Sequence, residues 1–159
     1  MQADRGLLKI LSEFGAQIKW EKSILTVTHA KETKGFQADI NDHPDLFPVL
    51  VILACAATNK SRIEGIHRLQ NKESDRLAAM CAALDAWGIK FEIVDDYISI
   101  YGNGALPFAK LSSFNDHRIA MAICIASLLS TEGQEIDDLQ CLKKSYPNFF
   151  EDFLALSKG

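Results

Sequence analysis

Two short charged segments of the chain have the residue types needed to act on an anion. Lys72-Glu73-Ser74-Asp75-Arg76 and Asn115-Asp116-His117-Arg118 each come directly before an apolar pattern with helical spacing. The start of a helix favours phosphate or carboxylate, because its first N–H groups are unpaired and its dipole is positive there. Lysine and arginine at that end are unfavourable unless an anion balances them. We therefore interpret the two segments as parts of an anion-binding site.

The overall composition limits the class of protein. The chain has 159 residues, 48% of them hydrophobic, which is enough for one compact core. Its net charge of −4 argues against a nucleic-acid partner, which would favour a basic domain. The longest apolar run, residues 46–57, is about half of the roughly 20 residues that a bilayer requires, and the N-terminus does not resemble a signal peptide. We expect a soluble, cytoplasmic protein without a membrane partner.

The four cysteines give no sign of a metal centre. Cys55, Cys81, Cys124 and Cys141 lie mostly within apolar stretches and lack Cys-x-x-Cys or Cys/His ligand spacing. This pattern is typical of buried free thiols in a reducing compartment. We expect neither a metal ion nor another cofactor.

An internal repeat positions the charged segments. Asn41-Asp42-His43 recurs as Asn115-Asp116-His117, 74 residues later, and residues 14–20 resemble residues 87–92, which follow at a distance of 73. We interpret the chain as a single partial domain with repeats at about 4–66 and 74–139, and with a third repeat begun at 140–159.

Each repeat is expected to contain a helix, a two-stranded hairpin, a third strand, an apolar helix and a closing strand. In the first copy we expect helices at residues 7–14 and 46–57, a hairpin of strands 17–20 and 25–28, and a closing strand at 62–65. In the second copy we expect helices at 74–87 and 119–129, a hairpin of strands 90–94 and 97–101, and a closing strand at 134–138. Helices 46–57 and 119–129 are apolar all round, which indicates that other layers enclose them. The prediction is an α/β (α+β) fold of repeated βαβαββ units, with buried helices and outer sheets. Trp20, Trp87 and the phenylalanines are expected in the core.

Four motifs together resemble the carboxy-terminal part of the 5-enolpyruvylshikimate-3-phosphate synthases. They are Pro44-Asp45, the two charged segments, and Lys143-Lys144-Ser145-Tyr146-Pro147 followed by Phe149-Phe150. The resemblance runs from about residue 4 to residue 157. It implies the inside-out α/β barrel of the enolpyruvyl transferases, and a transferase of the shikimate pathway and aromatic amino acid biosynthesis. Its substrates would be 3-phosphoshikimate and phosphoenolpyruvate.

The resemblance also implies roles for individual residues. Asp45 matches the family's acceptor of the proton from the shikimate 5-hydroxyl. Glu73 matches the carboxylate that protonates the phosphoenolpyruvate methylene and later removes a proton from the intermediate. The family's cations that bind phosphoenolpyruvate match Arg76, Arg118 and Lys144.

Lys72 would contact the substrates near the reacting centre. His117 would either orient a substrate or act as a structural corner residue, since His43 duplicates it. Arg68 falls where some members place an asparagine that touches phosphoshikimate, and Gln70-Asn71 also depart from the family's pattern.

The same residues also have purely structural interpretations. Asp45 follows a proline near a helix start, where aspartate is a common capping residue. Ser74 has the type of an N-cap, and Glu73 with Arg76 has the spacing of a solvated helix pair. Asp42 and Asp116 are expected to cap or brace the helices that follow them.

The family's amino-terminal phosphate-loop motifs are absent from the 159 residues. We therefore expect a fragment whose missing partner is the amino-terminal domain of the same enzyme, without turnover alone and with a tendency to self-associate. A relative of UDP-N-acetylglucosamine enolpyruvyl transferase, or a non-catalytic anion-binding module, is the alternative. The first fits the charged segments less well, and the second gives no purpose to two carboxylates.

Overall fold

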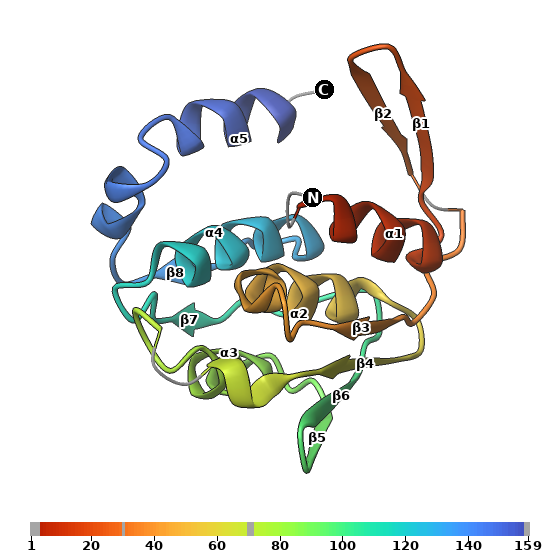
Figure 1. Ribbon diagram of the computed structural model, residues 1–159. Coiled ribbons are helices and arrows are strands. Elements are labelled where there is room, and N and C mark those ends of the chain that lie inside the picture. Colours follow the sequence, from red (N-terminus) through yellow and green to blue (C-terminus); the bar gives the residue numbers. More distant parts are fainter. Residues whose placement is uncertain (1–3, 30, 70–71, 158–159) are drawn as a thin grey trace.

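The computed structural model describes residues 4–29, 31–69 and 72–157, and in it one order of elements occurs twice (Figure 1). Gln70 and Asn71 lie outside the described residues. The first copy contains α1 (Asp4–Phe14), β1 (Gln17–Glu21), β2 (Ile24–Thr28), β3 (Gln37–Asp39), η1 (Pro44–Leu46), α2 (Phe47–Ala56) and β4 (Lys60–Glu64). The second contains η2 (Ile66–Leu69), α3 (Arg76–Ala86), β5 (Phe91–Val94), β6 (Tyr97–Tyr101), β7 (Lys110–Leu111), α4 (His117–Ala126), η3 (Ser127–Leu129) and β8 (Glu135–Ile136). It is followed by η4 (Gln140–Lys144) and α5 (Phe149–Ser157).

The strands form one larger sheet and two small ones. The larger sheet has the order β3-β4-β6-β5, in which β3 is parallel to β4 while β6 runs antiparallel to both β4 and β5. Strands β7 and β8 repeat the parallel pair: Gln37 faces Arg62 in the first copy, and Lys110 faces Glu135 in the second. The hairpin of one copy is thus joined to the parallel pair of the copy before it.

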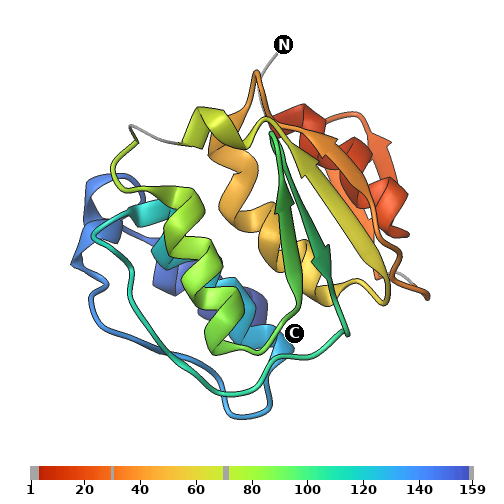
Figure 2. The ribbon, with the colours of Figure 1, turned by 90° about the horizontal axis from the view of Figure 1, so that it is seen from below.

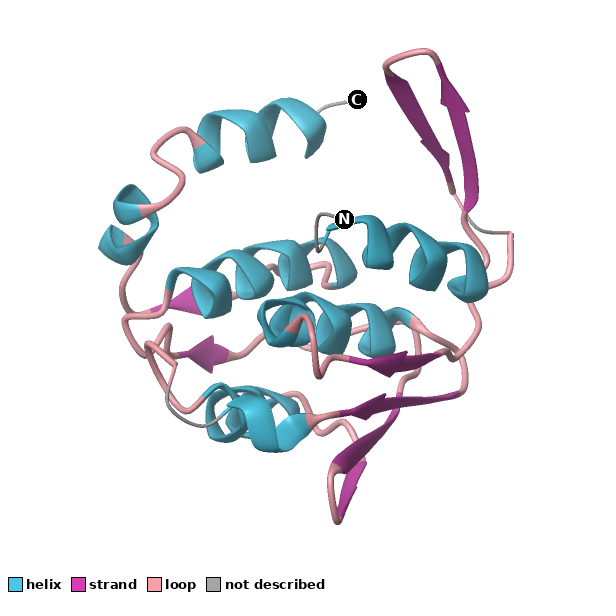
Figure 3. Cartoon of the chain, in the orientation of Figure 1, coloured by secondary structure: helices cyan, strands magenta, loops and turns pink. Residues whose placement is uncertain are grey.

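The helices α2 and α4 lie inside the molecule, as their apolar sequences predict. They pack against each other and against α3, and α2 also contacts β4 and β6 (Figures 1 and 2). Phe47, Leu50 and Val51 of α2 and Ile119 of α4 are almost fully buried. In the view of Figure 3 these helices lie above strands β3, β4 and β7, while the β1–β2 hairpin projects at the top. The expected arrangement of buried helices and outer sheets is confirmed.

The two hairpins differ in what covers them. In β6, which pairs with β4, Ile98 and Ile100 are buried in the core beneath α2, whereas all five residues of β2 are exposed. Trp20 on β1 is 59% exposed, so the prediction that it belongs to the core is wrong, while Trp87 is buried as expected. The prediction is also wrong for three phenylalanines, which are exposed: Phe108, Phe114 and Phe150.

Local signals in the sequence end the helices where expected. Gly15 follows α1 with a φ of 118° and Gly88 follows the α3 turn with a φ of 65°, a backbone conformation that other residues rarely adopt.

The cysteines are free thiols, three of them buried and Cys81 partly so. Within the part of the chain that the structure describes, no helix is both long and apolar enough to cross a membrane.

Candidate functional site

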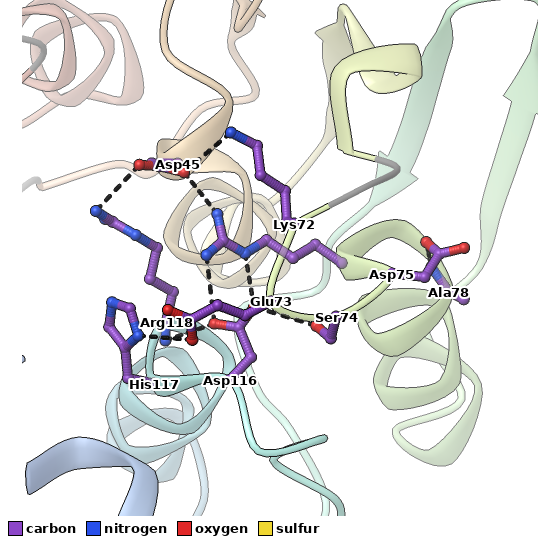
Figure 4. Close-up of polar contacts among 10 residues, drawn as sticks. Asp45, Lys72, Glu73, Ser74, Asp75, Ala78, Asp116, His117 and Arg118 are labelled. Atoms are coloured by element: carbon purple, nitrogen blue, oxygen red, sulfur yellow. Dashed lines mark hydrogen bonds and ion pairs between the residues drawn. The ribbon is translucent and has the colours of Figure 1, made fainter. Parts of the chain in front are cut away.

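The starts of three helical segments meet at one place, and each start is fixed by a local signal (Figure 4). Pro44 begins η1, which leads into α2. The Asp75 carboxylate accepts a hydrogen bond from the Ala78 backbone N–H at 3.0 Å and caps α3. Asp116 accepts one from the Arg118 N–H at 2.9 Å and caps α4. These caps orient the charged side chains of the first turns toward one another.

Three cations converge on Asp45. Its Oδ1 atom lies 2.6 Å from Arg76 Nη1 and 3.7 Å from Lys72 Nζ, and its Oδ2 atom lies 3.1 Å from Arg118 Nη2. The three cations come from the segment before α3, from α3 and from α4. Asp45 lies in the first turn of η1, as its structural interpretation expects, but its carboxylate also contacts three cationic side chains.

A buried ion pair lies behind this group. Arg76 Nε is 2.8 Å from Asp116 Oδ2, and Nη2 is 3.4 Å from Oδ1. The Arg76 side chain is 3% exposed and that of Asp116 is completely buried. Ser74 Oγ donates to Asp116 at 3.1 Å, so Ser74 is not the N-cap that its residue type suggested.

The pKa values of the pair follow from these contacts. Burial raises the pKa of the Asp116 carboxyl, but hydrogen bonds from Arg76, the Arg118 N–H and Ser74, with the charge of Arg76, bring it below the ordinary value. Burial lowers the pKa of the Arg76 guanidinium, and its bonds to Asp116 and Asp45 raise it above the ordinary value. Both groups are therefore charged at neutral pH, and Arg76 is held in one orientation.

Glu73 and His117 form a second pair at the same place. His117 Nδ1 is 2.9 Å from Glu73 Oε2, and the histidine is mostly buried while the glutamate is half exposed. Among the described ion pairs, Glu73 has none with Arg76, so the expected solvated helix pair is wrong. His117 thus contacts the carboxylate of Glu73. Its duplicate, His43, takes the N-cap position of η1, and its side chain makes no capping hydrogen bond there.

A cation is a poor fit to this site. One ligand atom each of Glu73, Asp116 and His117 lie within 4.8 Å of one another, a spacing that a metal ion can use. However, both oxygens of Asp116 already accept bonds from Arg76, Ser74 and the Arg118 N–H. With Lys72 and Arg118 as two further positive charges nearby, the arrangement favours an anion.

Two residues expected at the site are not joined to it by the described contacts. Lys144 is exposed on η4, and its side chain makes no ion pair or hydrogen bond within the described part of the chain, although η4 packs against α4. Arg68 is exposed on η2. Conversely, Asp116 was expected only to cap α4, as it does, yet it also anchors Arg76. Asp42, its duplicate, is exposed and does not cap η1, where His43 takes the N-cap position.

Known proteins resemble the chain over nearly its whole length. The family model of EPSP synthase (3-phosphoshikimate 1-carboxyvinyltransferase) matches residues 1–153. The 3-phosphoshikimate 1-carboxyvinyltransferase of Thermococcus kodakarensis is 40% identical over 156 residues, and that of Pyrococcus furiosus is 39% identical over 158. These matches cover 98% and 99% of this chain but 38% of each relative. The chain thus spans well under half the length of these relatives.

Solved structures share its fold. An EPSP synthase from Acinetobacter baumannii superposes with a TM-score of 0.80 at 28% identity, covering 92% of this chain and 37% of that one. The enolpyruvyl transferase NikO from Streptomyces tendae gives a TM-score of 0.73 at 18% identity, covering 96% of this chain and 35% of that one. The second likeness supports the fold alone.

Proposed function

The chain belongs to the EPSP synthase (3-phosphoshikimate 1-carboxyvinyltransferase) family, and we propose that it supplies the phosphoenolpyruvate-binding wall of such an enzyme. The whole enzyme would convert 3-phosphoshikimate and phosphoenolpyruvate to 5-enolpyruvylshikimate 3-phosphate and phosphate, in the cytoplasm and within aromatic amino acid biosynthesis. The observation that carries this proposal is the convergence of Lys72, Arg76 and Arg118 on one carboxylate from three segments.

The reaction requires an acid, a base and fixed cations. The 5-hydroxyl oxygen bonds to C2 of phosphoenolpyruvate while the hydroxyl loses its proton and the methylene carbon gains one. The intermediate then loses a proton from the new methyl group as the bond to phosphate breaks. Positioned proton donors and acceptors lower both barriers, and cations stabilise the carboxylate and the departing phosphate.

The two carboxylates of the site suit the proton transfers. Asp45 would accept the hydroxyl proton, since its carboxylate is partly exposed and charged. Glu73 would protonate the methylene carbon and later take a proton from the methyl group, and His117 would hold its carboxylate in place. The two acids come from different segments, which allows them to act on different atoms of the bound substrates.

The cations suit the donor substrate. Arg76 is fixed by buried Asp116, so its guanidinium would already be oriented when a carboxylate or phosphate arrives. Arg118 and Lys72 would complete the contact, and Lys144 would join from η4. We assign Arg68 to the phosphoshikimate side, where the partner domain would supply most of the pocket.

Binding of phosphoenolpyruvate to the chain tests the proposed site. We expect saturable binding in an NMR titration, and at least about a tenfold loss of affinity in Arg118→Gln, because a charge-assisted contact contributes about 1.5 to 3 kcal/mol. Lys110→Gln is the matched control, since Lys110 is an exposed cation paired with Glu135 on the small sheet. Equal affinities of the two variants would contradict the assignment.

A further inference from the structure

The Asp45 carboxylate is already paired with the cations that the proposed function assigns to substrate binding. Oδ1 contacts Arg76 and Lys72, and Oδ2 contacts Arg118, so both of its oxygens are engaged. Figure 4 shows the Asp45 carboxylate between the charged ends of Lys72 and Arg118. A carboxylate or phosphate of a substrate would require the same donors.

The orientation of Arg76 makes this competition direct. Its Nε and Nη2 atoms donate to Asp116, which is completely buried, so these two directions are closed to a ligand. The Nη1 atom donates to Asp45 at 2.6 Å. Since the Asp45 side chain is 44% exposed, it is the partner of Arg76 that a ligand from solvent can replace.

We propose that Asp45 acts as an internal competitor, which holds these cations in the empty protein until a substrate anion displaces its carboxylate. Displacement would also release Asp45 from the cations, in time for it to accept a proton. The proposal rests on the proposed function, because it concerns the same anion site. By linkage, a bound anion must strengthen proton binding to Asp45 as much as protonation of Asp45 strengthens anion binding.

The charges around Asp45 support such a coupling. Burial raises the pKa of its carboxyl, but the hydrogen bond from Arg76 and the charges of Arg118, Arg76 and Lys72 lower it below the ordinary value. A carboxylate held in this way is a weak base, and an anion that takes over the cations would restore its basicity. Other titratable groups near it are Glu73 from the segment before α3, and Asp116 and His117 from the start of α4. His43 precedes Asp45 at the N-cap of η1, and η2, which packs against η1, carries His67 and Arg68.

Sulfate binding at neutral pH tests the competition, because sulfate remains a dianion and resembles phosphate. We compare the wild-type chain with Asp45→Asn and with the control Asp42→Asn by calorimetry. Asp42 is an exposed carboxylate three residues earlier, and among the described ion pairs it has none with the three cations. We expect Asp45→Asn to bind sulfate about tenfold more tightly than wild type, and Asp42→Asn to differ by less than about twofold.

The outcomes separate this inference from the function on which it rests. Sulfate binding that is equal or weaker in Asp45→Asn than in Asp42→Asn would overturn the competitor role alone. An absence of binding in all three proteins would overturn the anion site as well. A second measurement needs no variant: in the wild-type chain, sulfate must raise the midpoint pH of the Asp45 carboxyl signal in carbon-13 NMR. An unchanged midpoint would also overturn the proposal.

Discussion

At the scale of single residues, Asp116 connects the starts of α3 and α4. It caps α4 through the Arg118 N–H and neutralises the buried guanidinium of Arg76. Arg76 in turn reaches Asp45 on η1. One carboxylate thus fixes the orientation of the cation that is central to the site, and its loss would affect stability and binding together.

We expect Asp116→Ala to lower the free energy of unfolding by about 3 kcal/mol, because it leaves a buried charge with only part of its compensation. Asp42→Ala is the matched control, since it changes the same motif in the first repeat at an exposed position. There we expect a loss below about 0.5 kcal/mol. Urea denaturation measures both values. Equal losses would mean that the pair with Arg76 does not stabilise the fold.

The same pair predicts how stability depends on pH. The pKa of Asp116 is lower in the folded chain than its ordinary value of 3.8, so the unfolded chain binds more protons between the two values. This contribution is fully present above the ordinary value and is lost as the pH falls through the folded pKa. We therefore expect the stability difference between wild type and Asp116→Ala to shrink between about pH 5 and pH 3. A constant difference in urea midpoints over that range would contradict this.

The sequence predicted most elements because their local signals are strong. The hairpins and the two apolar helices lie within a few residues of their expected positions, since turn residues, β-branched runs and glycine caps depend on neighbours in the chain. The burial of Asp116 and the exposure of its duplicate Asp42 were not predictable from that shared motif. The burial of Asp116 depends on its pair with Arg76, which comes from another helix, whereas Asp42 has no partner among the described ion pairs. Likewise, Trp20 has the composition of a core residue, but its hairpin is not covered by a further strand among those described.

At the scale of elements, the open hairpin is where we expect the chain to self-associate. Strand β2 has no charged residue, and its outer edge is unpaired among the described strands, a combination that favours pairing with another chain. Light scattering across concentrations should therefore show association of the wild-type chain, which Val27→Lys on β2 reduces. Val94→Lys is the control, at a similarly exposed valine on β5, which is also an edge strand but already carries the charged Glu92. A wild-type chain that stays monomeric, or two variants with equal effects, would contradict the role of β2.

At the scale of the whole molecule, the chain would provide one wall of a larger site. It covers 38% of its relative from Thermococcus kodakarensis, and two cations of its site, Lys72 and Arg118, are partly exposed to solvent. Such catalysis depends on positioning both substrates and excluding water, which one wall cannot do alone. We therefore expect no turnover from the isolated chain.

The most direct test of the proposed half-site is phosphate release from 3-phosphoshikimate and phosphoenolpyruvate. The chain is assayed alone and mixed with the remaining part of the Thermococcus kodakarensis relative, after size-exclusion chromatography has shown that the two parts associate. We expect phosphate release only from the associated mixture, and its loss in both Asp45→Asn and Glu73→Gln. Release by the chain alone, no release by the associated mixture, or full release by the two variants would contradict the assignment of this chain as the wall that carries both carboxylates.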